Sequence, residues 1–264
     1  ELIRNALERG CHKFLIAIGG SATNDGGMGL LQALGFRFLD AEGKELPGCG
    51  GSLQQIQQID SSGVLVDLAQ CQFTVACDVT NPFYGPTGAA YVFAPQKGAD
   101  AEMVEALDQG LRHFAQLIHT TQGIAIDQLA GAGAAGGLGG GLVAFLNARL
   151  TPGIEMVLDA LRFDTQITGA DLIITGEGKL DAQTCMGKTP LGILRRAQQQ
   201  GIPVVALGGA VEASEALNQC GFLAVFPILP YPTSLTEAMD SSFTQQNIER
   251  TIAQVLRLFS AFSS

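Results

Sequence analysis

The chain has 264 residues, of which 47% are hydrophobic and 15% are charged, so it is long enough to bury a core and is not intrinsically disordered. Asp and Glu (25) outnumber Lys and Arg (15), and the net charge of −10 argues against a nucleic-acid binder, whose surface must attract phosphates. The longest apolar runs have strand length and are interrupted by glycine, so no membrane span is expected.

The six cysteines form no C-x-x-C pair, and none has a histidine at zinc-finger spacing. Several lie in apolar, strand-like runs, where a reduced and buried thiol is the ordinary interpretation. We therefore expect a cytoplasmic protein. The first residues show no signal peptide, and they begin within a helix without an initiator methionine, so we expect a fragment of a longer protein.

Apolar strands that run directly into glycines organise the chain. A helix over residues 2–7 ends near Gly10, and the strand at 14–18 is then apolar on both faces and leads into Gly19 and Gly20. Such strands are typical of parallel sheets that are covered on both sides. Further strands are predicted at 172–174, 204–207 and 223–226. Helices are predicted near them at 188–200, 212–219 and 244–262, and this alternation indicates an α/β fold with a Rossmann-like parallel sheet.

The middle of the chain has a different pattern. Residues 35–60 are rich in turns, a strand is predicted at 73–77, and a long helix at 100–119. A glycine-rich segment at 131–137 is predicted to open a helix through Leu150. We interpret residues 34–165 as an inserted α/β domain. The flanks, 1–33 and 166–264, would form the Rossmann-like lobe, incomplete at its N-terminal side, with a ligand cleft between the two.

The loop after the first strand, residues 19–27, combines small residues with Asn24 and Asp25 at the carboxyl end of that strand. Small residues leave backbone N–H groups free to face an anion. A turn that caps the helix expected at 28–34 is the structural alternative. The density of polar groups between glycines favours a functional site. The binding residues expected in this loop are Gly19, Gly20, Ser21, Thr23 and Asn24.

Three further segments carry charged candidates. Asp78 ends the strand at 73–77 and is followed by Asn81-Pro82, which a simple turn would also explain. Lys97, in the Pro95–Gly98 segment, is most simply a surface lysine. Glu177 and Asp181 follow another buried strand, and two carboxylates there could hold Mg²⁺ together with water. Their alternative role is loop solubility and helix capping.

Two glycine motifs are incomplete. Gly131 to Gly136 satisfies G-x-G-x-x-G, but no acid follows at the expected distance, so close packing at a helix start is favoured over dinucleotide binding. Gly187-Lys188-Thr189 resembles the end of a phosphate-binding loop, but Ala182 stands where its first glycine is needed. A phosphate contact and a solvated side chain are equally good interpretations of Lys188. The three histidines are best read as surface residues.

Taken together, these segments resemble the bacterial type-I glycerate kinases over essentially the whole chain and in the same order. The matching segments are 18–27, 77–82, 95–99, 131–139, 175–181 and 187–190. The resemblance implies two α/β domains, one inserted in the other. It also implies ATP- and Mg²⁺-dependent phosphorylation of D-glycerate in organic acid catabolism, with 2-phosphoglycerate as the favoured product.

Under this hypothesis the roles divide into three groups. Proton acceptance and charge neutralisation fall to Asp78, Asp25, Lys97 and Lys188. Phosphate or the glycerate carboxylate is held by the loop residues named above together with Asn81, Gly133, Gly136 and Gly137. Mg²⁺ or its water is held by Glu177 and Asp181.

Some features depart from the family pattern. Family members carry a further N-terminal segment with Asp-Ser-Phe-Lys and Asp-Gly-Gly-Glu-Gly motifs, and Lys179-Leu180-Asp181 replaces the commoner Arg-Leu-Asp. An inactive fragment or a small-ligand-binding module of the same fold is therefore the main alternative to a kinase. A nicotinamide dehydrogenase using Gly131–Gly136 is a weaker one. The apolar composition leaves room for a homodimer.

Overall fold

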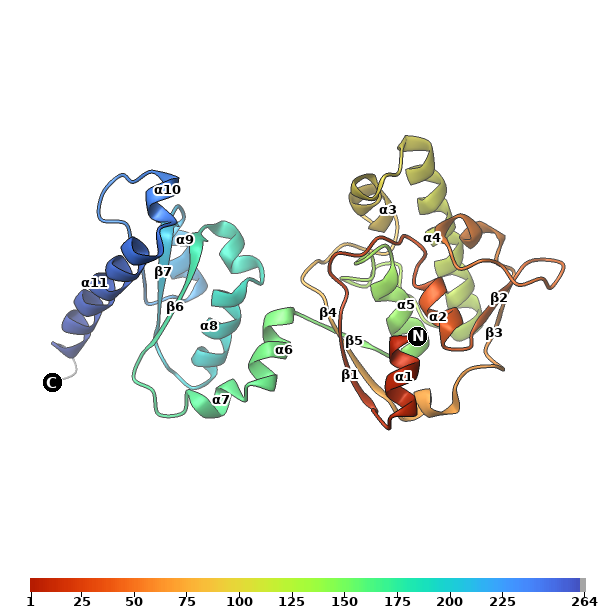
Figure 1. The fold of residues 1–264 in the computed structure, drawn as a ribbon, viewed down its shortest axis with the longest axis horizontal. Coiled ribbons are helices and arrows are strands. Elements are labelled where there is room, and N and C mark those ends of the chain that lie inside the picture. Colours follow the sequence, from red (N-terminus) through yellow and green to blue (C-terminus); the bar gives the residue numbers. More distant parts are fainter. Residues whose placement is uncertain (262–264) are drawn as a thin grey trace. The chain divides into compact units, whose positions relative to one another are not determined.

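The computed structural model describes residues 1–261, with the backbone alone at positions 66, 67 and 186. These residues form two compact units (Figure 1), a first unit, Glu1–Gly153, and a second unit that begins at Ile154. Each unit has its own parallel sheet, so the predicted α/β class is confirmed. Across the described residues, no helix combines the length and the apolar character that crossing a membrane requires.

A three-stranded parallel sheet organises the first unit. β1 (Lys13–Ala17) pairs with β4 (Gln72–Ala76), and β4 pairs with β5 (Arg149–Thr151). Phe73 and Val75 are buried on one face of β4, whereas Leu15 of β1 is 66% exposed. We expected the strand at 14–18 to be covered on both faces. In the described residues, β1 is covered on only one face.

Helices and a small antiparallel sheet build the core on the covered face. α4 (Ala101–Gln122) begins at its N-cap Asp100, whose carboxylate accepts from the Met103 N–H, and ends at Gly123 in the left-handed conformation. β2 (Arg37–Leu39) and β3 (Gln58–Asp60) pair as this two-stranded antiparallel sheet. The remaining helices of this unit are α1 (Leu2–Glu8), α2 (Met28–Ala33), α3 (Ala89–Phe93) and α5 (Leu138–Leu146), with short 3₁₀ turns η1 (Gly50–Gln55), η2 (Val66–Gln70) and η3 (Pro95–Lys97).

The helix predicted through Leu150 ends earlier, at Leu146. Asn147 has φ 50°, a left-handed conformation that terminates the helix, and residues 149–151 then pair with β4. The prediction was wrong because this short strand has no sequence pattern of its own. It forms because β4 offers it a free edge.

The second unit is a parallel sheet with helices on both faces. β7 (Val204–Val211) lies between β6 (Ile173–Leu180) and β8 (Ala224–Pro227). Along β7, Val204 and Ala206 pack in one core with α8 (Thr189–Gln199) and α9 (Ser214–Cys220). Val205 and Leu207 pack in another core with α11 (Ser241–Ser260), and Figure 1 shows α8 and α11 on opposite sides of β6 and β7. The shorter elements are α6 (Gly153–Ala160), α7 (Phe163–Gln166), η4 (Ala182–Met186) and α10 (Leu235–Ala238).

Two of these strands continue through glycines beyond their predicted ends. The strand predicted at 172–174 continues as β6 through Thr175–Gly178 to Leu180, and the strand predicted at 204–207 continues as β7 through Gly208 and Gly209 to Val211. A Cβ on Gly176 would lie 2.6 Å from the Leu207 carbonyl oxygen. The predicted strand ends were wrong because these glycines allow neighbouring backbones to approach closely.

The two units also group the residues differently from the predicted domains. Residues 1–33, which we assigned to a lobe with 166–264, belong to the first unit, because β1 pairs with β4. The division falls after Gly153 instead of at residue 165. An apolar strand shows that it is buried but does not show which strand it pairs with, so the sequence pattern could not place β1.

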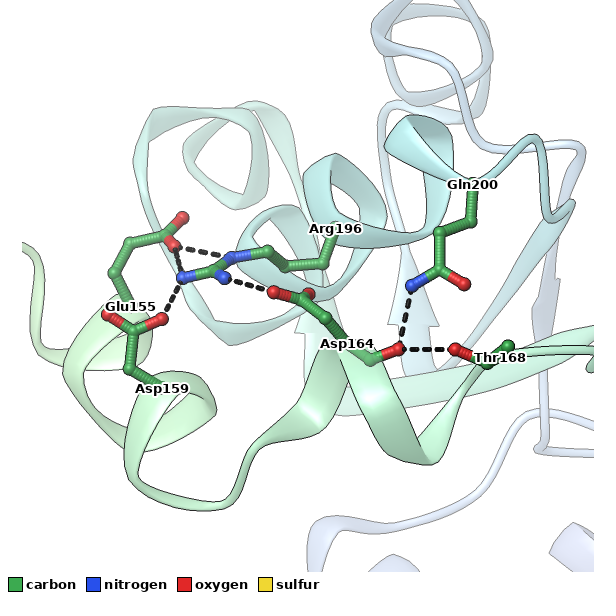
Figure 2. A network of polar contacts seen from close by, with 6 residues as sticks. All are labelled: Glu155, Asp159, Asp164, Thr168, Arg196 and Gln200. Carbon is green, nitrogen blue, oxygen red and sulfur yellow. Dashed lines mark hydrogen bonds and ion pairs between the residues drawn. The ribbon is translucent and has the colours of Figure 1, made fainter.

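A single arginine connects three helices of the second unit (Figure 2). Arg196 of α8 donates to Glu155 and Asp159 of α6 and to Asp164 of α7, with distances of 2.9 Å from Nε to Glu155 Oε2 and 2.7 Å from NH1 to Asp164 Oδ2. The backbone carbonyl of Asp164 also accepts from the Gln200 amide at 2.7 Å. The guanidinium thus holds α6 and α7 against α8.

Replacing Arg196 with alanine should destabilise the second unit by about 1–2 kcal/mol, because charge-assisted hydrogen bonds are lost and three carboxylates remain close together. The expected loss of stability is modest because the Asp159 and Asp164 side chains are about half exposed, so water screens their ion pairs with Arg196. The matched control is the exposed neighbour Arg195→Ala, which should change stability little. Urea unfolding of both variants measures the difference, and equal midpoints would contradict the role of Arg196.

Candidate active site

A pocket of about 430 Å³ lies at the carboxyl ends of β1 and β4 in the first unit. Parallel strands end at the same edge of a sheet, where ligands commonly bind. The pocket brings together residues from separate predicted motifs. Its lining includes Gly19, Gly20, Ser21, Asp78 and Lys97.

Lys97 is held over the loop that follows β1. Its ammonium donates to Ser21 Oγ at 2.9 Å and to the Thr23 carbonyl oxygen at 2.6 Å. Burial lowers the pKa of Lys97 below its ordinary value, and the Asp25 carboxylate opposes this shift in part. The lysine is thus a fixed, partly desolvated cation and not the freely solvated side chain of the alternative interpretation.

Asp78 follows β4 and lies exposed at the pocket. Its Oδ1 accepts a hydrogen bond from the Gly153 N–H at 2.8 Å. This bond orients the carboxylate and leaves further oxygen lone pairs to accept a proton or a hydrogen bond. Burial, reinforced by the charge of Asp78, raises the pKa of the neighbouring Cys77 thiol, which therefore stays protonated.

Asp25 and Asn24 lie deeper than expected. Both Asp25 oxygens accept backbone N–H groups at 3.0 Å, from Gly27 and Gly29, so this carboxylate caps the start of α2. This is the structural alternative considered for the loop, and it leaves Asp25 acting on the pocket through its charge on Lys97. The Asn24 amide is buried, and neither its oxygen nor its nitrogen has a hydrogen-bond partner.

The glycine segment at 131–137 packs against backbone. A Cβ on Gly133 would lie 2.1 Å from the Pro82 carbonyl oxygen, and one on Gly136 would lie 2.1 Å from the Thr23 carbonyl oxygen. Gly137, with φ 89°, caps α5. Asn81 donates to the Thr87 carbonyl at 2.8 Å and so stabilises a turn. These four predicted binding residues are therefore not among those that line the pocket.

The pocket is also lined by residues that were not predicted, among them Gln96, Ala134 and Ala135. Ala135 has φ 55°, a conformation that costs about 1 kcal/mol for a residue with a Cβ. Gln96 could have been predicted as a pocket residue, because it is next to Lys97 in the sequence. Nothing in the sequence indicates the backbone conformation of Ala135.

The second unit gathers the other three predicted residues. Lys188 Nζ lies 3.5 Å from Asp181 Oδ1 and 3.9 Å from Glu177 Oε2, and the Thr184 hydroxyl donates to Glu177 Oε1. Desolvation raises the pKa of Asp181, but the Gln183 N–H and Lys188 outweigh it, so the pKa lies below its ordinary value. The result is two carboxylates that lie close to one lysine ammonium.

Glu177 also lines a cavity of about 1300 Å³ in the second unit. The ends of β6 and β7 form one side, and both apolar and polar residues of α10 and α11 form the other. Among the described residues, no group of three or more His, Cys, Asp or Glu is placed to hold a metal ion. In this cluster, a divalent cation would have the carboxylates of Glu177 and Asp181 as its acidic ligands.

As the pH rises, the affinity of the first-unit pocket for anions should fall. This fall should begin at a lower pH than it would with a lysine of ordinary pKa. The reason is that the pKa of Lys97 is lowered, so its charge is lost sooner. The unfolded chain then binds this proton more tightly, so Lys97 by itself makes stability increase with pH across the same range.

Titration with inorganic phosphate at several pH values measures this effect. Lys97→Met should bind phosphate weakly with little pH dependence, whereas Lys44→Met, at an exposed lysine outside the pocket, should behave like the unaltered chain. Identical pH profiles for all three proteins would contradict the assignment of Lys97.

Comparison with known proteins adds a family. A family model described as the glycerate kinase family matches residues 1–260. A glycerate kinase from Halalkalibacterium halodurans is 46% identical over 90% of this chain, and one from Bacillus subtilis is 45% identical over 97%. The chain spans 63% and 66% of these two relatives, so it covers less than two thirds of either.

Two further matches are informative. A glycerate 2-kinase from Escherichia coli is 43% identical over 97% of this chain, which spans 69% of it. A solved structure from Salmonella typhimurium LT2, whose description as glycerate kinase 2 is provisional, superposes with a TM-score of 0.80 at 42% identity. That match covers 99% of this chain and 68% of the solved one.

Proposed function

Because the chain belongs to the glycerate kinase family, we propose that it contributes the greater part of an enzyme that phosphorylates D-glycerate with ATP. The observation that carries this proposal is the first-unit pocket, where a fixed cation, a glycine loop and an exposed carboxylate meet. We further propose 2-phosphoglycerate as the product, supported by the name of the Escherichia coli relative, and a role in organic acid catabolism.

The first unit is proposed to hold the acceptor. Lys97 and the small residues Gly19, Gly20 and Ser21 can bind a carboxylate or phosphoryl oxygen by charge and by backbone N–H groups. Asp78, fixed by the Gly153 N–H, can accept the proton of an attacking hydroxyl. Phosphoryl transfer asks mainly for such positioning and charge stabilisation.

The second unit is proposed to hold the phosphates and the metal. The carboxylates of Glu177 and Asp181 both lie close to the Lys188 ammonium. Such a pair suits Mg²⁺, which usually takes one or two carboxylates together with phosphates and water. Glu177 and Asp181 would hold the ion, which when bound neutralises charge on the phosphates. Lys188 can bind a phosphoryl oxygen, and Thr184 keeps the Glu177 carboxylate in place.

Two properties of the whole protein are further proposals. Exposed thiols at Cys11 and Cys49 suit a reducing compartment, which supports a cytoplasmic location. A homodimer is proposed on the apolar composition, and the exposed Leu15 on β1 is compatible with it. Sedimentation of the purified chain measures the oligomeric state.

The deciding experiment measures ADP release by the purified 264-residue chain with Mg-ATP, with and without D-glycerate, together with calorimetric titration of each ligand. Glycerate-dependent release supports the kinase. Binding of both ligands without release favours the alternative of a ligand-binding module. Binding of neither ligand contradicts the assignment of both sites in this chain, and stabilisation by NAD would favour the dehydrogenase instead.

A further inference from the structure

Two cysteines meet in the second unit at a place that the proposed kinase chemistry does not use. Cys185 lies on η4, and Cys220 is the last residue of α9. These two elements pack against each other, and both side chains border the core that α8 shares with β7. The two side chains lie near each other, since the Cys220 side chain contributes to a raised pKa of the Cys185 thiol. Both residues remain partly exposed, so a small oxidant can reach them.

We propose that Cys185 and Cys220 form a reversible disulfide that ties η4 to α9. Cys185 and Cys220 are far apart in the sequence. The folded unit already packs η4 against α9, so little further ordering of the chain is needed to form the bond. To form the bond, the two sulfurs must approach to a separation of about 2.0 Å. Rotation of the two side chains, neither of which is fully enclosed, can supply this movement.

The chemistry is balanced with a low-molecular-weight disulfide as the oxidant. The Cys220 thiolate attacks one sulfur of the oxidant, which forms a mixed disulfide and releases the first small thiol. Cys185 then attacks the Cys220 sulfur, its proton passes to the departing second thiolate, and the protein disulfide is complete. The two protein thiols lose two electrons and two protons, and the oxidant is reduced to two thiols.

Protonation sets the order of attack and the rate. Desolvation, together with the Cys220 contact, raises the pKa of Cys185 to about 11, so this thiol keeps its proton at neutral pH. Cys185 is therefore the poorer first nucleophile, so we place the first attack at Cys220 and the second at Cys185. Oxidation should become faster as the pH is raised toward the pKa of Cys185.

Because of its location, the disulfide would affect the neighbouring cluster of Glu177, Asp181 and Lys188. Cys185 follows Thr184, which donates to Glu177, and it precedes the Gly187-Lys188 pair by only two residues. Gly187 has φ 113°, which allows this segment to turn sharply. A disulfide at Cys185 would restrain the segment that carries Lys188, so the cluster becomes sensitive to oxidants.

The test uses the whole chain incubated with oxidised glutathione at mildly alkaline pH, then digested with trypsin and analysed by mass spectrometry. The expected product links the peptide of residues 180–188 to that of residues 197–250, and dithiothreitol releases both. Cys49→Ser, which removes an exposed thiol elsewhere, should still form it, whereas Cys220→Ser should not. Hydrogen exchange over 180–188 should become slower on oxidation in the unaltered chain but not in Cys220→Ser.

Glutathione adducts on Cys11 and Cys49 without the linked peptide would overturn the proposal, since they would show that oxidant was present and the pair did not close. A linked peptide that forms equally well in the urea-unfolded chain would also overturn it, because proximity in the folded unit would then not matter. Neither result depends on kinase activity, so this inference stands or falls separately from the proposed function.

Discussion

Replacing Asp78 with asparagine is expected to lower glycerate-dependent turnover by about 10²- to 10⁴-fold, the usual contribution of a general base. The substitution removes the proton-accepting carboxylate. It keeps an amide oxygen that can accept the Gly153 N–H, which Asp78 Oδ1 now accepts at 2.8 Å. Because the side chain is exposed, the stability of the first unit should change little. ADP release and urea unfolding measure the two effects.

The matched control for Asp78→Asn is Asp100→Asn. Asp100 caps α4 outside the pocket, and asparagine caps helices about as well as aspartate, so both turnover and stability should be kept. Loss of turnover in Asp78→Asn alone assigns the proton transfer to this carboxylate. Full turnover in that variant would remove Asp78 from the reaction and would leave it only the role of orienting the backbone at Gly153.

The parts of the fold that were predicted correctly are those with local causes. α4 has an apolar stripe, an N-cap at Asp100 and a glycine at its end, so its bounds are set by neighbouring residues. β5 and the strand glycines of β6 have no such local signal. Their conformation depends on β4 and on Leu207 of β7, partners that are distant in the sequence. Local pattern could not supply those pairings, nor the grouping of β1 with β4.

The candidate site divides in the same way. Asp78 and the loop at 19–21 were found because carboxyl ends of parallel strands meet at one edge of a sheet, a rule that needs no knowledge of side-chain contacts. The loop at 131–137 looked like a phosphate cradle, although its glycines are there to admit the Thr23 and Pro82 backbones. Composition alone cannot distinguish a glycine that faces a ligand from one that faces another strand or loop.

Gly136→Ala should therefore destabilise the first unit by about 2–5 kcal/mol, although it adds only one methyl group. Its φ of 73° costs about 1–2 kcal/mol for any residue with a Cβ. The new Cβ would also lie 2.1 Å from the Thr23 carbonyl oxygen, and forced displacement in a packed region costs about 1–3 kcal/mol more. Urea unfolding of the first unit measures the sum.

Gly123 separates these two causes, because its φ of 72° is nearly the same and no atom lies within 4 Å of its Cβ position. Gly123→Ala should thus show the conformational cost alone, and equal losses in both variants would contradict the packing role of Gly136. The difference should also reach the pocket. The Thr23 carbonyl that Gly136→Ala must displace is the one that accepts from Lys97 at 2.6 Å, so this variant should bind phosphate more weakly whereas Gly123→Ala should not. Gly136, which does not line the pocket, would in that way set the position of the Lys97 ammonium, which does.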